Sequence, residues 1–77
     1  MSELSAFIEV NAEIMMGKPV IKGTRIPVEL ILDKLAAGVS ENELLADYPR
    51  LSVDAIHAAL AFAAETLRQI KVYSVAS

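Results

Sequence analysis

The chain has 77 residues, no cysteine and a net charge of -3 at pH 7, from seven basic and ten acidic side chains. This length makes one domain (1–77), close to the lower limit for a self-sufficient core, and the absence of cysteine excludes disulfides and thiolate metal sites. The net charge repels nucleic acid on average and favours a basic partner, so any DNA contact needs a local basic patch.

Residues 7–26 are predicted to form a short β-hairpin-like element. The segment Phe7–Val10 alternates and is rich in strand-forming residues. A second run, Val20–Ile21, is followed by Lys22-Gly23-Thr24, in which glycine supplies the positive φ of a tight turn. Residues 11–17 are expected to connect the two runs.

Residues 27–70 are predicted to form three helices. From Pro27, which suits the first helical position, apolar side chains recur with a period of 3.6. Gly38 is expected to end this first helix. The second begins at Ser40, whose hydroxyl can cap the amide of Glu43 while the Glu43 carboxylate reaches back.

The third helix, capped by Ser52 after Pro49 stops the second, is predicted to run to about Ile70. It carries two apolar stripes. The main one, expected to face the core, is Val53, Ile56, Leu60, Ala63, Leu67 and Ile70. A second stripe, about a third of a turn away, is Ala55, Ala58 and Phe62.

Apolar residues make up 55% of the chain, which is more apolar surface than a domain of this size readily buries by itself. This composition predicts a homodimer that buries part of that surface between subunits. The residues expected at the dimer interface are Ile8, Val10, Ala55, Ala58 and Phe62. The alternative is an alanine-rich helix of high propensity, with Phe62 covered by the β element of its own chain. The tail 71–77 either frays or adds an edge strand to a partner.

No catalytic or metal-binding set stands out. His57 is the only histidine, without a second histidine or a cysteine to complete a metal site. Gly17-Lys18 does not open a phosphate loop, since Pro19 has no amide to donate. We therefore expect no enzyme activity, cofactor, metal or small-molecule substrate. The start Met1–Ser5 lacks signal-peptide features and no run approaches the ~20 apolar residues of a membrane span, which predicts a cytoplasmic protein.

The three helices have the spacing of a helix-turn-helix domain, whose third helix would enter the major groove by its N-terminal end. Near that end only Arg50 is a typical DNA-contacting residue, and Asp54 would repel phosphate. Lys18, Lys22 and Arg25 form a basic patch on the β element. This patch either follows a DNA backbone, pairs with acidic residues of another subunit or protects a hairpin edge. The candidate nucleic-acid or partner-binding residues are Lys18, Lys22, Arg25, Arg50, Ser52 and His57.

The string Gly17-Lys18-Pro19-Val20-Ile21-Lys22-Gly23-Thr24-Arg25-Ile26-Pro27-Val28 strongly resembles the family called domain of unknown function 433, and the resemblance covers roughly residues 7–66. It implies a mainly α fold, a homeodomain-like or winged-helix-like three-helix bundle with an N-terminal β element. Members are prokaryotic proteins often regarded as VapB-like antitoxins, encoded beside a toxin with a PIN-like nuclease fold.

The resemblance therefore implies a dimer that binds and silences a ribonuclease, with operator DNA as a second partner. In it, Arg25 would form an ion pair or bind a partner, and the motif's glycines and prolines would build the turn. An acidic surface would complement a basic RNA-binding cleft of the nuclease; its members are Glu41, Glu43, Asp47 and Asp54. The alternatives are a stand-alone DNA-binding regulator and a dimeric scaffold.

Overall fold

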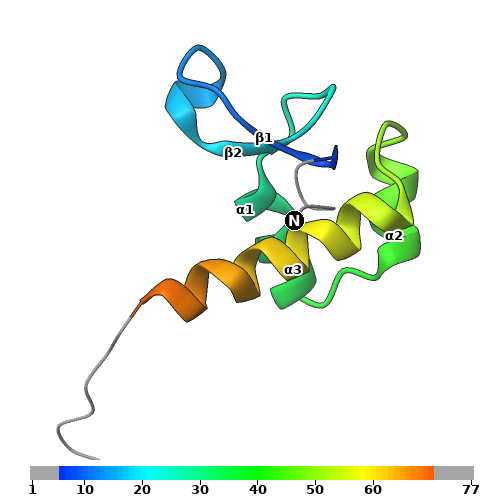
Figure 1. Ribbon diagram of the computed structural model, residues 1–77. Helices are drawn as coiled ribbons and strands as arrows, with labels where there is room; N and C mark the ends of the chain where they lie inside the picture. The colour runs from blue at the N-terminus through cyan, green and yellow to red at the C-terminus, as the bar shows by residue number, and fades with distance from the viewer. Residues whose placement is uncertain (1–5, 71–77) are drawn as a thin grey trace, which may run out of the picture.

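The structure, a computed structural model, describes residues 6–70 and shows three helices beneath a two-stranded antiparallel sheet (Figure 1). This confirms the expected mainly helical domain with an N-terminal β-hairpin. The tail 71–77 lies outside the described residues. The elements in chain order are β1 (Ile8–Val10), the 3₁₀ turn η2 (Met15–Gly17), β2 (Pro19–Ile21), α1 (Val28–Ala36), α2 (Glu41–Asp47) and α3 (Val53–Gln69).

The hairpin pairs Ile8 with Ile21 and Glu9 with Val20. Ile8 and Ile21 are buried on the face that covers the helices, while Glu9 is only half-buried. The amide of Lys22 extends the pairing by donating to the carbonyl of Phe7 at 2.7 Å. The alternation seen in the sequence therefore separates a core-facing side of β1 from a partly covered side, on which Val20, opposite Glu9, is buried.

Helix α1 starts one residue later than predicted. Pro27 is its N-cap, with φ -67° and ψ 144°, because it still forms an antiparallel bridge to Val20 and its backbone stays extended. At the other end Gly38 adopts φ +96°, as expected of a helix-ending glycine. The Val39 amide donates to the Lys34 carbonyl at 3.0 Å, which satisfies a carbonyl of the last turn.

Both predicted serine caps are confirmed. The Ser40 hydroxyl accepts from the Glu43 amide at 3.1 Å, and the Glu43 carboxylate accepts from the Ser40 amide at 2.9 Å. The Ser52 hydroxyl accepts from the Ala55 amide at 3.0 Å. These bonds form between residues three apart, so they fix the starts of α2 and α3 from local sequence alone.

The core lies where α1, α2 and the hairpin meet the N-terminal half of α3. Its largest fully buried side chains are Ile31, Leu44 and Ile56, while Val20, also fully buried, lies on the other face of the hairpin opposite Glu9. Each of the three helices contributes one of these core side chains. No helix within residues 6–70 is both long and apolar enough to cross a membrane.

The prediction for the two stripes of α3 was largely wrong. Ala55, Ala58 and Ala59 are buried with Ile56, because small side chains let α3 approach α1 and the hairpin closely. Ile56 is the one large member of the predicted main stripe that is buried, and the other large members are exposed. They are Val53, Leu60, Leu67 and Ile70.

This arrangement corrects the expected dimer interface. Ile8, Ala55 and Ala58 are buried inside the single chain, so their side chains have no surface to offer a second subunit. Phe62 is half-buried and packs against the core of its own chain. Of the five predicted interface residues, only Val10 is exposed.

Candidate partner-binding site

The turn between β2 and α1 holds Arg25 in a defined place. Gly23 takes φ +83°, which a side chain would disfavour. The Thr24 hydroxyl donates to the Ile21 carbonyl at 2.8 Å and accepts from the Ile26 amide at 2.9 Å. The Ile21 amide donates to the Ile26 carbonyl at 2.9 Å. This closed network presents the Arg25 side chain at the rim of the sheet.

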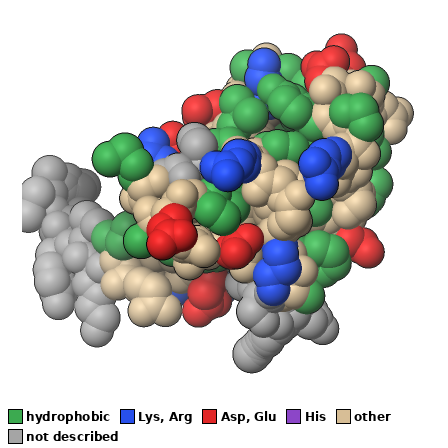
Figure 2. Space-filling model, turned by 90° about the horizontal axis from the view of Figure 1, so that it is seen from above, with side chains coloured by type: hydrophobic (Ala, Val, Ile, Leu, Met, Phe, Trp, Pro, Cys, Tyr) green, Lys and Arg blue, Asp and Glu red, His purple; other side chains and the backbone are tan. Residues whose placement is uncertain are grey.

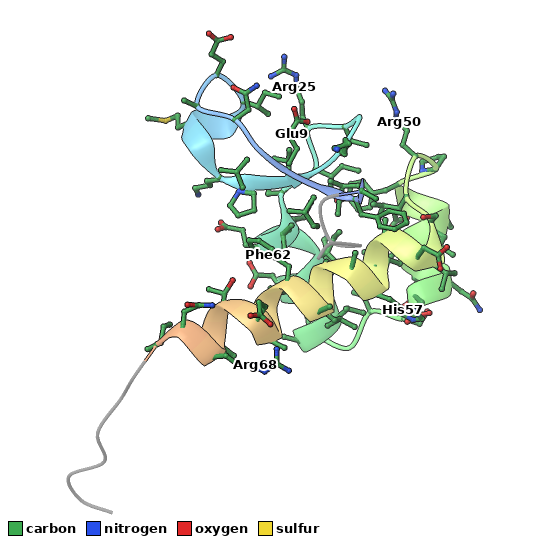
Figure 3. All side chains as sticks on the ribbon, viewed as in Figure 1. Glu9, Arg25, Arg50, His57, Phe62 and Arg68 are labelled. Carbon is green, nitrogen blue, oxygen red and sulfur yellow. The ribbon has the colours of Figure 1, made fainter. Side chains whose placement is uncertain are left out.

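A cleft of about 550 Å³ opens beside this turn. Arg25 and Arg50 both line it, the second from the turn that precedes α3. Figure 3 shows both side chains projecting to the same side of the molecule, with Glu9 of β1 close to Arg25. The other lining residues are Ile14, Gly23, Thr24 and Ile26. The cleft thus combines two guanidinium groups, one carboxylate and an apolar part.

Within residues 6–70 the side chains of Arg25, Arg50 and Glu9 form no hydrogen bond or ion pair. Both guanidinium groups are exposed. A guanidinium presents five N–H donors in a planar fork and binds carboxylates or phosphates in a bidentate way. The cleft can therefore bind an anionic group, while Glu9 disfavours a ligand with dense negative charge.

Lys18, another of the predicted basic residues, does not line the cleft and pairs with an acidic side chain of α1 instead. Lys18 Nζ lies 3.3 Å from Glu29 Oε2 of α1, in a contact between exposed side chains. Lys22 is exposed in the turn and does not line the cleft. In Figure 2, which looks down on this face, Lys and Arg side chains are spread among apolar and acidic ones and form no continuous stripe. The structure thus gathers only Arg25 and Arg50.

The remaining candidates have local roles. The Ser52 oxygen is occupied in the cap of α3. His57 lies on the opposite side of the molecule from the two arginines (Figure 3), with Nε2 3.2 Å from Glu41 Oε2. Within residues 6–70 no group of three or more histidine and acidic side chains could hold a metal ion.

The proposed acidic surface is also partly taken up by local contacts. Glu41 pairs with His57, and Glu43 closes the capping box of α2. Asp47 and Asp54 are exposed, and their side chains form no hydrogen bond or ion pair in the described part of the chain. This leaves two of the four acids for a basic partner.

A second hollow is an apolar groove of about 320 Å³ between α1 and the C-terminal half of α3. Phe62 and Leu67 line it from α3, and Leu32 lines it from α1. Glu29, at its edge, is already paired with Lys18. The groove suits an apolar side chain of a partner and has no arrangement that would perform chemistry.

Sequence reasoning missed Glu9, Ile14, Thr24 and Ile26 as lining residues of the cleft. The alternation in β1 does carry a signal for Glu9, since its buried neighbour Ile8 leaves it on the open face. No local pattern, however, predicts that Arg50 approaches a turn 25 positions earlier. That proximity depends on how the hairpin sits over the start of α3.

The profile of a family described as "Protein of unknown function (DUF433)" matches residues 8–63. The chain belongs to this family. The DUF433 match includes the turn, Arg25 and Arg50, and ends within α3. The family's description assigns no activity, and no curated protein matches this DUF433 member.

A solved structure agrees with this assignment. The crystal structure of a DUF433 member protein from Anabaena variabilis is similar to this one with a TM-score of 0.78 and 30% sequence identity. The similarity covers 87% of the present chain but 66% of that protein, so this DUF433 member spans about two thirds of its length.

Proposed function

We propose that this DUF433 member is a non-enzymatic, antitoxin-like protein with a helix-turn-helix layout, which neutralises a PIN-like ribonuclease by protein contact. The observation that carries the proposal is the pair of arginines at one cleft, Arg25 and Arg50, neither with an ion pair in residues 6–70. Unpaired guanidinium groups beside an apolar surface are typical of protein-binding hot spots.

The chemistry of the cleft fits a nuclease with an acidic active site. Such an enzyme holds its divalent metal with carboxylates, and the forked donors of Arg25 and Arg50 match carboxylates in a bidentate way. An arginine inserted there would compete with the metal for its ligands. Ile14 and Ile26 would provide apolar contact that excludes water from these ion pairs.

DNA binding is the second candidate, because guanidinium groups bind phosphate as well as carboxylate and Arg50 stands just ahead of α3. The acidic side chains weigh against it. Asp54 lies in the first turn of α3, where a base-reading side chain would be needed, and Glu9 lies in the cleft itself. The net charge of -3 adds a general repulsion.

The test is to co-express the tagged chain with its neighbouring gene product and to assay RNA cleavage by the complex and by the released partner. We expect a nuclease that is inactive when bound and active when freed. Replacing both cleft arginines (Arg25→Gln and Arg50→Gln) should weaken inhibition on the order of 100-fold. Lys34→Gln, which removes one charge from α1 away from the cleft, is the matched control.

Two results would contradict the proposal. One is recovery of the chain alone, and the other is equal inhibition by the double variant and the wild type. A DNA titration of the same variants then examines the second candidate. If Arg25 and Arg50 contact phosphates, their replacement should make the salt dependence of DNA affinity shallower by about one unit per lost contact.

A further inference from the structure

One side of α3 carries a row of exposed apolar residues that the single chain does not cover. Val53 is 41%, Leu60 43% and Leu67 66% exposed. Ala64, also exposed, lies one turn after Leu60 on the same side of the helix. We call Val53, Leu60, Ala64 and Leu67 the α3 seam. Its position differs from the buried stripe of Ala55, Ile56 and Ala59 that faces the core.

The spacing of the α3 seam is that of a helix that packs along another helix. Val53, Leu60 and Leu67 recur every seven residues, and seven residues are nearly two turns. Ala64 between the two leucines provides a small side chain that allows close helix approach. Figure 1 shows the C-terminal part of α3 extending past the other elements.

The surface is also continuous with a hollow. Leu67 belongs to the seam and to the apolar groove between α1 and α3. Isolated exposed apolar residues need no explanation, but Leu60, Ala64 and Leu67 follow one another on successive turns and lead into an apolar groove, which marks an interaction surface. An occupant of the seam must therefore be elongated, apolar on one side and helical.

The charges at the two ends of α3 indicate which helix would bind to the α3 seam. Asp54 lies at the start of α3, where it is exposed and its side chain forms no hydrogen bond or ion pair within residues 6–70. Arg68 lies near its end, where it contacts Glu65 at 2.7 Å on the exposed surface. A second α3 running antiparallel places Arg68 of one copy near Asp54 of the other. A parallel second α3 places like charges together, which is unfavourable.

We propose that the α3 seam binds the α3 seam of a second copy of this chain, antiparallel and about a two-fold axis near Leu60. In this arrangement Leu60 packs on Leu60 of the second copy, and Val53 packs on Leu67 of the second copy. An isologous contact of this kind closes on itself and produces a dimer. The proposal is independent of the proposed function, because the arginine cleft takes no part in it.

The first test is light scattering of the full chain together with Leu60→Glu. The wild type should give twice the 8.3 kDa of a single chain. Leu60→Glu brings two carboxylates together on the two-fold axis and should raise the dissociation constant of the dimer by about 30-fold or more. Gln69→Glu adds the same charge on an exposed position away from the seam and should remain dimeric.

The orientation is tested by disulfide trapping, which is clean because the natural chain has no cysteine. An equal mixture of Val53→Cys and Leu67→Cys should form cross-linked dimers under oxidation, and either variant alone should not. Circular dichroism establishes that each variant keeps its helices. A wild-type monomer, or self-cross-linking of Val53→Cys alone, would overturn the proposal.

Discussion

The substitution Thr24→Val examines the turn that holds Arg25. Valine keeps the branched shape of threonine and removes only the hydroxyl. That hydroxyl makes two hydrogen bonds, to the Ile21 carbonyl at 2.8 Å and from the Ile26 amide at 2.9 Å. The Ile21 carbonyl keeps a second donor, because the Thr24 amide lies 3.0 Å from it. The Ile26 amide has no such replacement and becomes unpaired.

The expected cost follows from this difference between the two partners. A hydrogen bond contributes about 1 kcal/mol net, and an unpaired buried donor costs about 1–3 kcal/mol. Because Thr24 and Ile26 are half-buried, water partly compensates the exposed side of the turn. We expect Thr24→Val to lower the free energy of unfolding by about 2 kcal/mol. For a domain of this size that is roughly an 8–16 °C fall in Tm.

Thr24→Ser is the matched control, since it keeps the hydroxyl and loses one methyl group, worth at most about 1 kcal/mol. Urea and thermal unfolding followed by circular dichroism measure both variants. The m-value should stay constant, because the surface exposed on unfolding hardly changes. If Thr24→Val is as stable as Thr24→Ser, the hydroxyl does not hold the turn and the reasoning on Arg25 fails with it.

Two further variants examine the helix ends by urea unfolding. Gly38→Ala should cost about 1 kcal/mol, because Gly38 has φ +96° while an added Cβ would meet nothing within 4 Å, which makes backbone conformation the whole effect; unchanged stability would contradict it. Ser40→Ala should also cost about 1 kcal/mol by removing the cap on the Glu43 amide. Asn42→Ala in the same turn, which should be neutral or slightly stabilising, is its control.

The elements of this protein could be predicted because their signals are local. Ser40, Ser52 and Gly38 satisfy backbone groups within a few residues of themselves, and Gly23 needs only its own φ to make the turn. Such interactions depend on neighbours in sequence, so they can be predicted before any tertiary contact is known. The start of α1 is the exception. It was predicted one residue too early, because the bridge that keeps Pro27 extended is a contact with Val20 of another element.

The sequence by itself thus determined where helices and turns begin and end, and it supplied Arg25 and Arg50 as separate candidates. Only the tertiary structure decided that these two share one cleft and that α3 buries the alanines of its N-terminal half while it exposes Leu60 and Leu67. The physical reason is that a helix with apolar residues on two sides is compatible with either orientation. The side that the hairpin and α1 can approach most closely becomes the core, and here the small alanine side chains allow that approach.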